Sequence, residues 1–503
     1  MNQSVEKIPF INPATSAIFG EVPITSPETA VEMLNELKMR APLWAEMPIA
    51  QRVRILRKFQ TALIDNRDQI TSVINQDCGK SRQDALIELF VTLDMFSQYI
   101  GHAKKWLAPE RVSSGLYFLK KSVVEHRPHG VVLVISPWNY PLTLSLPPML
   151  AALLAGNTVI LKPSEITPAT GKLIEDLFNK VPELAPYVKV AHGNGETGAS
   201  LVNAGPDFIF MTGSTATGRK IMASAAERLT PLSLELGGKD AMIVLEDADL
   251  RQAARWGAWG AFFNTGQTCM AVERVYVVGN NFEPFVKLAV EEAHKFTAGY
   301  SEDKNNFHSM GPVTDLRQAR IIDAHLADAL SKGAKLLCGG KKEGLFYDPM
   351  VLVDVDHSME IMKEESFGPF MPIMKVESEA EAIALANDSR YGLGASVWSN
   401  NDAHAKKIAD KLHASSVIIN DCIAQFGIPM LPFGGVKESG FGRVHGKQGL
   451  LQFTRPYGYA IGQPPKPWDI ATILRKPGMY GLAEKLMCFL FGTNMNQKLF
   501  RDK

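Results

Sequence analysis

The sequence has no excess charge of either sign, since its 503 residues include 53 Lys plus Arg and 53 Asp plus Glu. A chain with balanced charge has no general attraction to nucleic acid, so nucleic acid is not expected as a partner. The sequence also has no internal repeat and no low-complexity tract. Repeat and disordered classes are therefore excluded, and we expect an ordinary globular protein.

Cysteine is scarce, with five residues in the whole chain. Cys78, Cys269, Cys338, Cys422 and Cys488 are far apart and show neither a CxxC pair nor the Cys/His spacing of a zinc site. An odd number of scattered cysteines argues against a disulfide framework and suits a reducing compartment. We therefore expect no metal site and no disulfide network.

A secretory signal and a long uninterrupted apolar run are also lacking. The first residues, MNQSVEKIPFINPATS, have neither the basic start nor the apolar core of a signal peptide. The longest apolar region, about residues 130 to 161, is interrupted by prolines at 137, 141, 147 and 148 and by asparagines at 139 and 157. It is a poor membrane span and a good buried strand–loop–helix, so we expect a cytoplasmic protein.

What the sequence does have is a regular alternation of helices and apolar strands. Its length suits about two or three domains, and residues 28–108 have the apolar spacing of helices. Continuous apolar strands then alternate with helices, which predicts a parallel sheet covered on both faces. The expected strands of this first series are GVVLVISP, NTVILKPS, VKVAHG and DFIFMTGS. A second series after Leu236 includes DAMIVLED, RVYVVG, ASVWS and SSVIIND, which predicts a second α/β domain.

Two strand–helix turns could bind a dinucleotide. Gly213–Gly218, with the sequence GSTATG, follows a strand and opens a helix, where free N–H groups favour a pyrophosphate. The alternative is a tight connection without a ligand. Lys162 and Glu165 follow another strand, at the edge where open parallel sheets bind ligands. This pair either holds the hydroxyl groups of a ribose or is a solvated ion pair.

Three further residues are candidates for chemistry. The stretch NTGQTCM places Cys269 in a loop of small polar residues, where the thiol either fills a hole or is presented as a nucleophile. Glu235 closes a strand before two glycines, so its carboxylate faces either solvent or an open site. Asn139, in SPWNYPL between two prolines, has a fixed backbone. Its amide is a candidate oxyanion donor together with the N–H of Cys269.

Taken in order, these motifs resemble the NAD(P)-dependent aldehyde dehydrogenase superfamily over about residues 8 to 455. The resemblance rests on PWNYP (137–141), KPSE (162–165), GSTATG (213–218), LELGGKD (234–240), GQTC (266–269), EESFGPF (364–370) and PFGGVKESGFGR (432–443). It implies that Cys269 is the nucleophile, Glu235 the general base and Asn139 the oxyanion donor. The cofactor contacts that it implies are Trp138, Lys162, Ser164, Glu165, Gly195, Gly213, Ser214, Thr215, Gly218, Leu236, Glu365 and Phe367.

The resemblance also implies a fold and a reaction. The expected α/β fold has a Rossmann-like cofactor domain from residues 1–108 and 127–236, and a catalytic α/β domain from residues 237–440. A β oligomerisation arm from residues 109–126 and 441–462 implies a homodimer or homotetramer. The implied reaction oxidises an aldehyde to its acid through a thiohemiacetal and a thioester on Cys269, without a metal. NAD is the expected cofactor because Glu165 would repel a 2′-phosphate, and NADP is the alternative.

The residues around the nucleophile predict an apolar substrate tunnel. Met270, Cys422 and Phe426 are its expected wall, and the later loop NDCIAQFGIPM contains no basic residue. Arg274 is expected to face away. We therefore expect a medium- or long-chain aliphatic aldehyde, or an aromatic aldehyde, because buried methylenes stabilise binding by about 0.8 kcal/mol each.

Several alternatives remain open at this stage. A semialdehyde dehydrogenase and an enzyme that acylates coenzyme A are the enzymatic rivals, although Glu235 favours hydrolysis. A catalytically inactive structural relative is the non-enzymatic rival. The extension 463–503 contains a short amphipathic helix with Leu482, Leu486, Phe489 and Leu490 on one side. This helix could pack on a subunit, cap the tunnel or contact a membrane surface, and fatty-aldehyde-type members of the family also carry C-terminal extensions.

Overall fold

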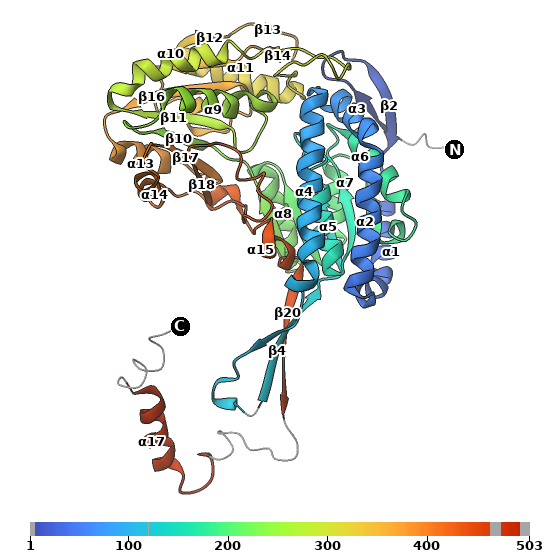
Figure 1. Cartoon of the computed structure of the whole chain (residues 1–503). Helices are drawn as coiled ribbons and strands as arrows, with labels where there is room; N and C mark the ends of the chain where they lie inside the picture. The colour runs from blue at the N-terminus through green and yellow to red at the C-terminus, as the bar shows by residue number, and fades with distance from the viewer. Residues whose placement is uncertain (1–5, 119, 463–473, 493–503) are drawn as a thin grey trace. The chain divides into compact units, whose positions relative to one another are not determined.

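The computed structural model describes residues 6–118, 120–462 and 474–492. Two compact units divide the chain. The first unit combines residues 1–106 and 128–454, and it contains two parallel-stranded sheets with their helices (Figure 1). The second unit combines residues 107–127 and 455–503. Each unit is described by itself.

The first sheet has six strands in the order β19-β9-β8-β5-β6-β7. Its strands are β5 (Val131–Ile135), β6 (Thr158–Lys162), β7 (Val188–Val190), β8 (Phe208–Thr212), β9 (Leu232–Glu235) and β19 (Gly440–Phe441). All neighbours pair in parallel except β19, which is antiparallel to β9. The chain starts at β5, moves outward through β6 and β7, and returns to β8 on the other side of β5. This Rossmann-like order creates a switch point between β5 and β8, where ligands of such sheets bind.

Burial on both faces explains why these strands are uniformly apolar. Val131 and Leu133 of β5 share a core with Leu34 of helix α1. The alternating residues Val132 and Val134 point to the opposite face of the sheet and are also fully buried. The helices of this half are α1 (Pro27–Glu46), α2 (Ile49–Asp65), α3 (Arg67–Cys78), α4 (Arg82–Trp106), α5 (Leu146–Ala155), α6 (Pro168–Asn179), α7 (Gly195–Asn203) and α8 (Thr215–Ala226). The expectation of helices over residues 28–108 is therefore confirmed.

The second sheet has seven strands in the order β12-β15-β16-β11-β10-β17-β18. These are β10 (Asp240–Val244), β11 (Val272–Val278), β12 (Lys335–Cys338), β15 (Met350–Val353), β16 (Phe370–Val376), β17 (Gly394–Trp398) and β18 (Ser416–Ile419). In this sheet β12 runs antiparallel to its neighbour β15. Alternate residues of β10 again enter different cores, since Ile243 belongs to one cluster and Met242 and Val244 to another.

The second sheet is covered by its own helices (Figure 1). They are α9 (Leu250–Phe262), α10 (Phe282–Ala293), α11 (Leu316–Ser331), α12 (Glu360–Lys363), α13 (Glu379–Asn387) and α14 (Asp402–Ala409). The four strands expected from the second sequence series are all present. The fold is therefore the predicted α/β arrangement of two parallel-stranded sheets.

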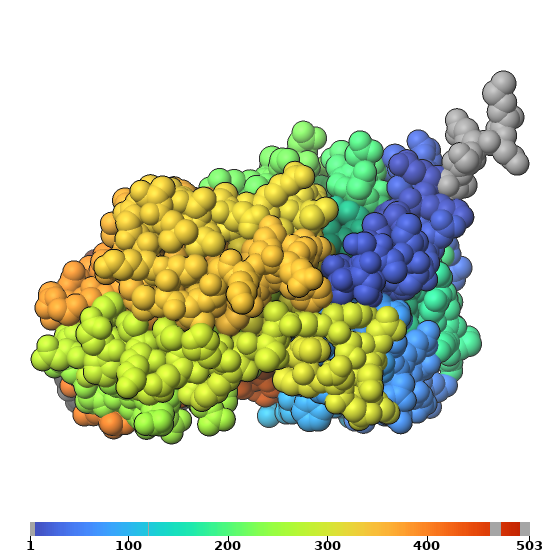
Figure 2. Space-filling view, turned by 90° about the horizontal axis from the view of Figure 1, so that it is seen from above, coloured from blue at the N-terminus to red at the C-terminus, as the bar shows by residue number. Residues whose placement is uncertain are grey.

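An N-terminal hairpin was not anticipated from the sequence. Its strands, β1 (Lys7–Ile11) and β2 (Ile18–Pro23), pair antiparallel. Asn12 Nδ2 donates to the hydroxyl of Tyr300 at 2.8 Å, and Figure 2 shows the blue N-terminal residues against the yellow part of the chain. The signal was weak because the strands are short and their apolar residues are half exposed.

The second unit contains a three-stranded sheet and a helix. The sheet has the order β20-β4-β3, with β3 (Glu110–Val112), β4 (Lys120–Pro128) and β20 (Thr454–Gly462). The guanidinium of Arg127 lies 3.3 Å from the ring centroid of Tyr457 and links β4 to β20. Helix α17 (Tyr480–Phe491) confirms the short helix expected there, and its Leu482 and Phe489 are exposed. Residues 463–473 and 493–503 of the extension lie outside the described residues. Within the described chain, no helix is long and apolar enough to cross a membrane.

Candidate active site

The loop that carries Cys269 has an unusual backbone. Asn264, Thr265 and Gly266 have φ values of 52°, 59° and 70°, so three consecutive residues are left-handed. Asn and Gly tolerate this region, but a β-branched Thr is strained there by about 1–3 kcal/mol. A Cβ at position 266 would lie 2.1 Å from the carbonyl oxygen of Gly368, so this position requires glycine. The loop is therefore held in a conformation that the sequence alone does not favour.

Hydrogen bonds from neighbouring segments hold this strained loop. Thr265 Oγ1 donates to the carbonyl of Gly311 at 2.9 Å, and the side-chain oxygen of Gln267 accepts from Thr314 N at 2.9 Å. The hydroxyl groups of Thr268 and Tyr140 are 2.9 Å apart. These buried contacts offset the backbone strain and fix Cys269 at the end of the loop.

Asn139 lies directly against this loop. It is buried, and its Nδ2 donates to the carbonyl of Gln267 at 3.0 Å. The buried ammonium of Lys80 donates to the backbone carbonyl of Asn139 at 2.7 Å and forms an ion pair with Glu88 at 2.8 Å. The structure thus brings Asn139 next to the cysteine loop and fixes its amide, with one of the two N–H groups engaged.

Glu235 ends strand β9 and is buried. Neither of its carboxylate oxygens has a hydrogen-bond partner among the described residues. Burial raises the pKa of Glu235 well above its usual range, and the charge of Arg443 opposes this only in part. A buried carboxyl group without a protein partner is a common property of catalytic acids and bases.

Cys269 is partly accessible from the cavities beside it, but protein surrounds its sulfur. Burial raises the pKa of the Cys269 thiol, and the nearby carboxylates of Glu365, Asp240 and Glu235 raise it further. Without another charge in the site, the neutral thiol is therefore favoured. A positive charge close to the sulfur would favour the thiolate.

The predicted adenosine contacts lie where β6 ends. Lys162 Nζ and Glu165 Oε2 form an ion pair at 2.8 Å, and Glu165 borders a large cleft. Burial acts to raise the pKa of Glu165, but the charge and hydrogen bond of Lys162 keep it below the ordinary value. Ser164 is buried, and its Oγ accepts from Ile166 N at 3.2 Å, which shapes this turn. Glu165 is thus an ionised acceptor facing open space.

The GSTATG turn lies at the switch point after β8. Ser214 caps helix α8 by accepting a hydrogen bond from Thr217 N at 3.3 Å, and Thr215 Oγ1 donates to the carbonyl of Glu438 at 3.1 Å. A Cβ on Gly218 would lie 2.8 Å from a methyl group of Leu236, so this glycine allows helix and strand to pack closely.

The remaining glycines of the predicted cofactor set differ in their surroundings. Gly195 begins helix α7, and a Cβ there would meet nothing within 4 Å. A Cβ on Gly213 would lie 2.5 Å from the terminal methyl group of Met211. Gly195 therefore faces open space at a helix N-terminus, whereas Gly213 is packed.

Glu365, Phe367 and Trp138 form a second group on the cofactor side. The carboxylate of Glu365 accepts from Gly238 N at 3.0 Å, and burial raises the pKa of Glu365 to about 8. The rings of Phe367 and Trp138 meet edge to face, with centroids 5.4 Å apart. A Cβ on Gly237 would lie 2.3 Å from Glu365, which explains why a glycine follows Leu236.

Sequence reasoning missed the ion pair that shapes this group. Glu273 accepts from the backbone N–H groups of Ser366 at 2.8 Å and Phe367 at 3.0 Å, and it pairs with the fully buried Lys239. Lys239 lies four residues after Glu235 within LELGGKD, and Glu273 lies four residues after Cys269. The signal was therefore the presence of Lys and Glu near two candidate residues and inside or beside strands that are otherwise apolar.

Two cavities meet at Cys269. The outer cavity, of about 160 Å³, is lined by Asp84, Ile87, Glu88, Val91, Tyr140, Thr143, Leu144, Trp259, Phe263, Thr268, Cys269, Met270, Ile423, Ala424, Phe426 and Gly427. Met270 and Phe426, the expected wall of the substrate tunnel, both contribute to this lining. No Lys, Arg or His occurs among these described lining residues, and two carboxylates do.

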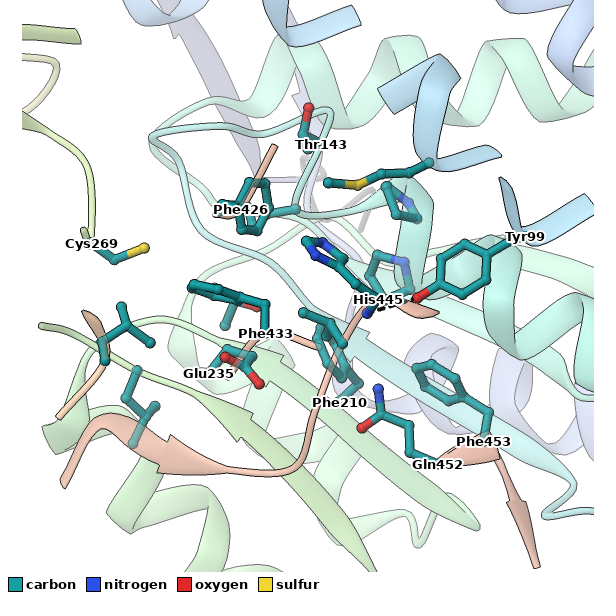
Figure 3. A pocket seen from close by; sticks show the side chains of 18 residues that line it. Tyr99, Thr143, Phe210, Glu235, Cys269, Phe426, Phe433, His445, Gln452 and Phe453 are labelled. Carbon is teal, nitrogen blue, oxygen red and sulfur yellow. Dashed lines mark hydrogen bonds between the residues drawn. The ribbon is translucent and has the colours of Figure 1, made fainter. Parts of the chain in front are cut away.

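The inner cavity lies on the Glu235 side and has a volume of about 40 Å³ (Figure 3). Cys269, Glu235, Leu236, Phe426 and Phe433 contribute to its wall, with Tyr99, Phe210, His445, Gln452 and Phe453 farther from the sulfur. Phe426 and two residues of the loop after Asn139, Thr143 and Leu144, belong to both cavities. Cys269 and Glu235 thus line the same cavity although 34 positions separate them in the sequence.

Cys422 does not line either cavity, so this part of the predicted tunnel wall is corrected. Its side chain is buried, and its Sγ donates to the carbonyl of Trp256 at 3.0 Å. The next residue, Ile423, has a φ of 64° and turns toward the outer cavity instead. Arg274 faces away from the cavities as expected, since its guanidinium donates to the carbonyls of Lys239, Leu385 and Ala386.

The fold and the site are those of an α/β oxidoreductase. They combine a Rossmann-like sheet with a cysteine and a glutamate that lie near the carboxyl edge of that sheet, where the predicted cofactor contacts are. Among the described residues, no group of His, Cys, Asp or Glu could hold a metal ion. A model of the aldehyde dehydrogenase family matches residues 1–457. The chain belongs to this family, and it is an oxidoreductase that acts on aldehydes.

Individual relatives agree with this assignment. The chain is 42% identical over 449 residues to a 4,4'-diapolycopene aldehyde oxidase of Methylomonas sp, covering 89% of this chain and 84% of the relative. It is 33% identical to a Mycobacterium ulcerans protein provisionally named succinate-semialdehyde dehydrogenase [NADP(+)] 2, covering 91% and 92% of the two chains. The solved structure of Escherichia coli lactaldehyde dehydrogenase matches with a TM-score of 0.87 and 31% identity, covering 92% and 97%.

Proposed function

We propose that this enzyme oxidises uncharged, predominantly apolar aldehydes to carboxylic acids, with Cys269 as nucleophile and Glu235 as general base. The observation that carries the substrate class is the outer cavity. Its wall is aromatic and aliphatic, with Trp259 stacked on Phe263 at 5.0 Å. It offers an alkyl chain or an aromatic ring a surface that excludes water.

The first step joins the aldehyde to the enzyme. Cys269 gives its proton to a water molecule, and its sulfur adds to the aldehyde carbon. The carbonyl oxygen becomes an oxyanion, which the backbone N–H of Cys269 and the free N–H of the Asn139 amide stabilise. The position of Asn139 against Gln267 supports this role, because the amide cannot turn away without losing a buried hydrogen bond.

The second step is the oxidation. Bound NAD(P)⁺ supplies the hydride acceptor. The described residues fit this cofactor: Glu165 is an ionised acceptor after the carboxyl end of β6, and helix α8 begins at the switch point. We propose that Glu165 and Lys162 hold the adenosine ribose and that Glu365 and Phe367 hold the nicotinamide ribose and ring. Loss of hydride from the thiohemiacetal carbon leaves a thioester on Cys269.

The third step is hydrolysis of the thioester. Glu235 takes a proton from a water molecule, the water oxygen attacks the thioester carbon, and the thiolate of Cys269 leaves. Its buried, unpartnered carboxyl group in the cavity beside Cys269 supports this role. Because Glu235 provides a base for water, we prefer hydrolysis to transfer of the acyl group to coenzyme A. Acid formation without added coenzyme A tests this choice.

An anionic semialdehyde is the second candidate substrate, because the Mycobacterium ulcerans relative carries that name. The outer cavity argues against it. Asp84 and Glu88 contribute to its wall, and the nearby cation Lys80 is already paired with Glu88. A substrate carboxylate would therefore be desolvated without a positive partner. Comparing kcat/KM for decanal and succinic semialdehyde decides between the two.

We also propose a cytoplasmic homo-oligomer in which the strands of the second unit, within residues 109–126 and 455–462, form the association arm. Residues 441–454, which the sequence also assigned to the arm, belong to the first unit instead. In this arrangement residues 1–108 and 127–236 bind the cofactor, and residues 237–440 carry the nucleophile. The exposed Val112, Tyr457 and Ile461 on the strands of the second unit support an association role. Light scattering after size-exclusion chromatography measures the assembly, and loss of the dimer on substituting Tyr457 and Ile461 with Asp is the expected result.

A further inference from the structure

The inner cavity contains polar groups that the mechanism above does not use. His445 and Gln452 contribute to its wall together with Glu235 (Figure 3). Four side-chain atoms of these residues are buried and have no hydrogen-bond partner among the described residues: Glu235 Oε1 and Oε2, His445 Nδ1 and Gln452 Oε1. All four are acceptors when Glu235 is ionised and His445 is neutral. Buried acceptors that share one cavity indicate a ligand that can donate hydrogen bonds.

The neighbours of His445 leave Nδ1 as its free atom. The ring packs against Phe426 and Phe433, with centroids 4.9 and 5.9 Å apart. Its backbone N–H donates to the Tyr99 hydroxyl at 3.0 Å, so the hydroxyl proton of Tyr99 also remains to be donated. Burial lowers the pKa of His445 to about 4, and a hydrogen bond to the backbone of Leu431 opposes this only in part. The imidazole is therefore neutral at neutral pH, with an acceptor at Nδ1.

The backbone of His445 is also unusual. Its φ of 67° and ψ of 160° lie in a region that residues other than glycine rarely adopt. Glycine would relieve this strain, yet position 445 has a large side chain directed into the cavity (Figure 3). The cost of holding this conformation indicates that the position of the imidazole matters.

The size of the cavity limits the ligand. A volume of about 40 Å³ has room for about two or three water molecules, since each needs at least about 10–15 Å³. A medium-chain alkyl group does not fit. Water also donates two hydrogen bonds, which suits a pair of acceptors such as Glu235 and Nδ1 of His445.

We propose that the inner cavity stores the water consumed in thioester hydrolysis, and that His445 is a positioning residue that fixes this water for Glu235. One water hydrogen donates to Nδ1 of His445, and the other donates to the carboxylate of Glu235. As the oxygen attacks the thioester carbon, the proton on the Glu235 side moves to that carboxylate and the C–S bond breaks. His445 gains no proton in this step. The inference rests on the proposed function, since it requires an acyl group on Cys269.

The experiment separates hydride transfer from hydrolysis. Rapid mixing of enzyme with NAD and decanal follows NADH formation in the wild type and in His445→Leu, His445→Phe, His445→Asn and Met95→Leu. The Leu variant removes the acceptor, and the Phe variant also keeps a ring against Phe426 and Phe433. Asn places an amide oxygen near the position of Nδ1 and tolerates positive φ. Met95→Leu changes another residue of the cavity wall without changing an acceptor.

The expected result is a burst of about one NADH per active site in the Leu and Phe variants, at the wild-type burst rate, then a steady rate lower by about tenfold or more. The acyl-enzyme accumulates and is visible by intact-protein mass. Because the side chain at position 445 only accepts a hydrogen bond and takes no proton, His445→Asn restores the steady rate to within about threefold. Met95→Leu keeps a higher steady rate than His445→Leu, because it removes no acceptor from the cavity.

Three outcomes would overturn the inference. The first is a steady rate in the Leu and Phe variants within about twofold of the wild type. The second is a slower burst, which would place the effect on hydride transfer. The third is equal loss in His445→Asn and His445→Leu, which would make the role one of packing. If the wild type forms no NADH from any aldehyde, the proposed function itself fails, and no variant can show a burst.

Discussion

The outer and inner cavities meet at Cys269 but offer opposite chemistry to what enters them. The outer cavity, of about 160 Å³, has an aromatic and aliphatic wall whose polar members are mostly engaged with neighbouring residues. The inner cavity, of about 40 Å³, holds buried acceptors without partners among the described residues. An apolar chain is stabilised in the first, and water in the second. The aldehyde can therefore reach the sulfur of Cys269 from the outer cavity, and water can reach the resulting thioester from the inner cavity.

Removal of the Cys269 sulfur prevents both aldehyde addition and thioester formation, so it has the largest expected effect. Cys269→Ser should lower kcat/KM for decanal by at least about a thousandfold, because a hydroxyl is a much weaker nucleophile at neutral pH. NADH formation measures this. Cys422→Ser is the matched control, since a serine hydroxyl can also donate to the carbonyl of Trp256. If Cys422→Ser lost activity while Cys269→Ser kept it, the assignment of Cys269 as the nucleophile would be contradicted.

Glu235→Gln impairs only the hydrolysis of the thioester. The steady rate should fall by about 10²–10⁴-fold, because the amide cannot accept the proton of the attacking water. A burst of NADH should remain, because Glu235 acts after hydride transfer, and pre-steady-state absorbance at the NADH band measures it. Acid production at the wild-type steady rate would exclude Glu235 as the base.

The pH profile tests the electrostatics that the two cavities share. Cys269 and Glu235 act in their deprotonated forms, and burial raises the pKa of both groups. The active fraction therefore falls as pH decreases, and kcat should rise by up to about tenfold per unit on the acid limb. That limb should lie well above the ordinary glutamate value of 4.5. A rate independent of pH between about 5 and 8 would contradict these shifts.

A positive charge at the edge of the outer cavity tests whether its apolar wall sets the substrate preference. This change has the smallest expected effect of the four. Ile87 is about half exposed on α4 and contributes to the outer cavity wall. Ile87→Arg should raise kcat/KM for succinic semialdehyde several-fold and lower it for decanal, a shift of about 1 kcal/mol each way. Ile87→Gln controls for polarity without charge. If Ile87→Arg changed kcat/KM equally for succinic semialdehyde and decanal, the charge of the cavity wall would not explain the substrate preference.

Much of the fold could be predicted from the sequence because its strands carry a local signal. Strands such as VVLVI in β5 are buried on both faces, so their apolar runs identify a covered parallel sheet. The N-terminal hairpin gave no such signal, since its short strands are only half buried. Cys269, Glu235 and Asn139 could be found because each lies in a motif of fixed type and order.

The rest of the site depends on contacts between distant segments. Cys422 and Ile423 are adjacent, yet one enters the core and the other lines the outer cavity, because a positive φ at Ile423 turns the chain there. Lys239 lies in the LELGGKD motif and Glu273 in none, but only the fold shows that the two side chains pair and that this pairing fixes the loop of Phe367. His445 was overlooked because a single buried histidine has no sequence signature of function.

The sequence by itself determined the alternating α/β architecture, the family and the identity of the reactive groups, because these follow from short-range patterns of apolar and polar residues. Only the tertiary structure decided which atoms share a space. The left-handed loop at Asn264–Gly266 and the end of β9 bring Cys269 and Glu235 to one cavity. Burial there removes water from both groups, and this desolvation sets their protonation, which no local pattern of residues can specify.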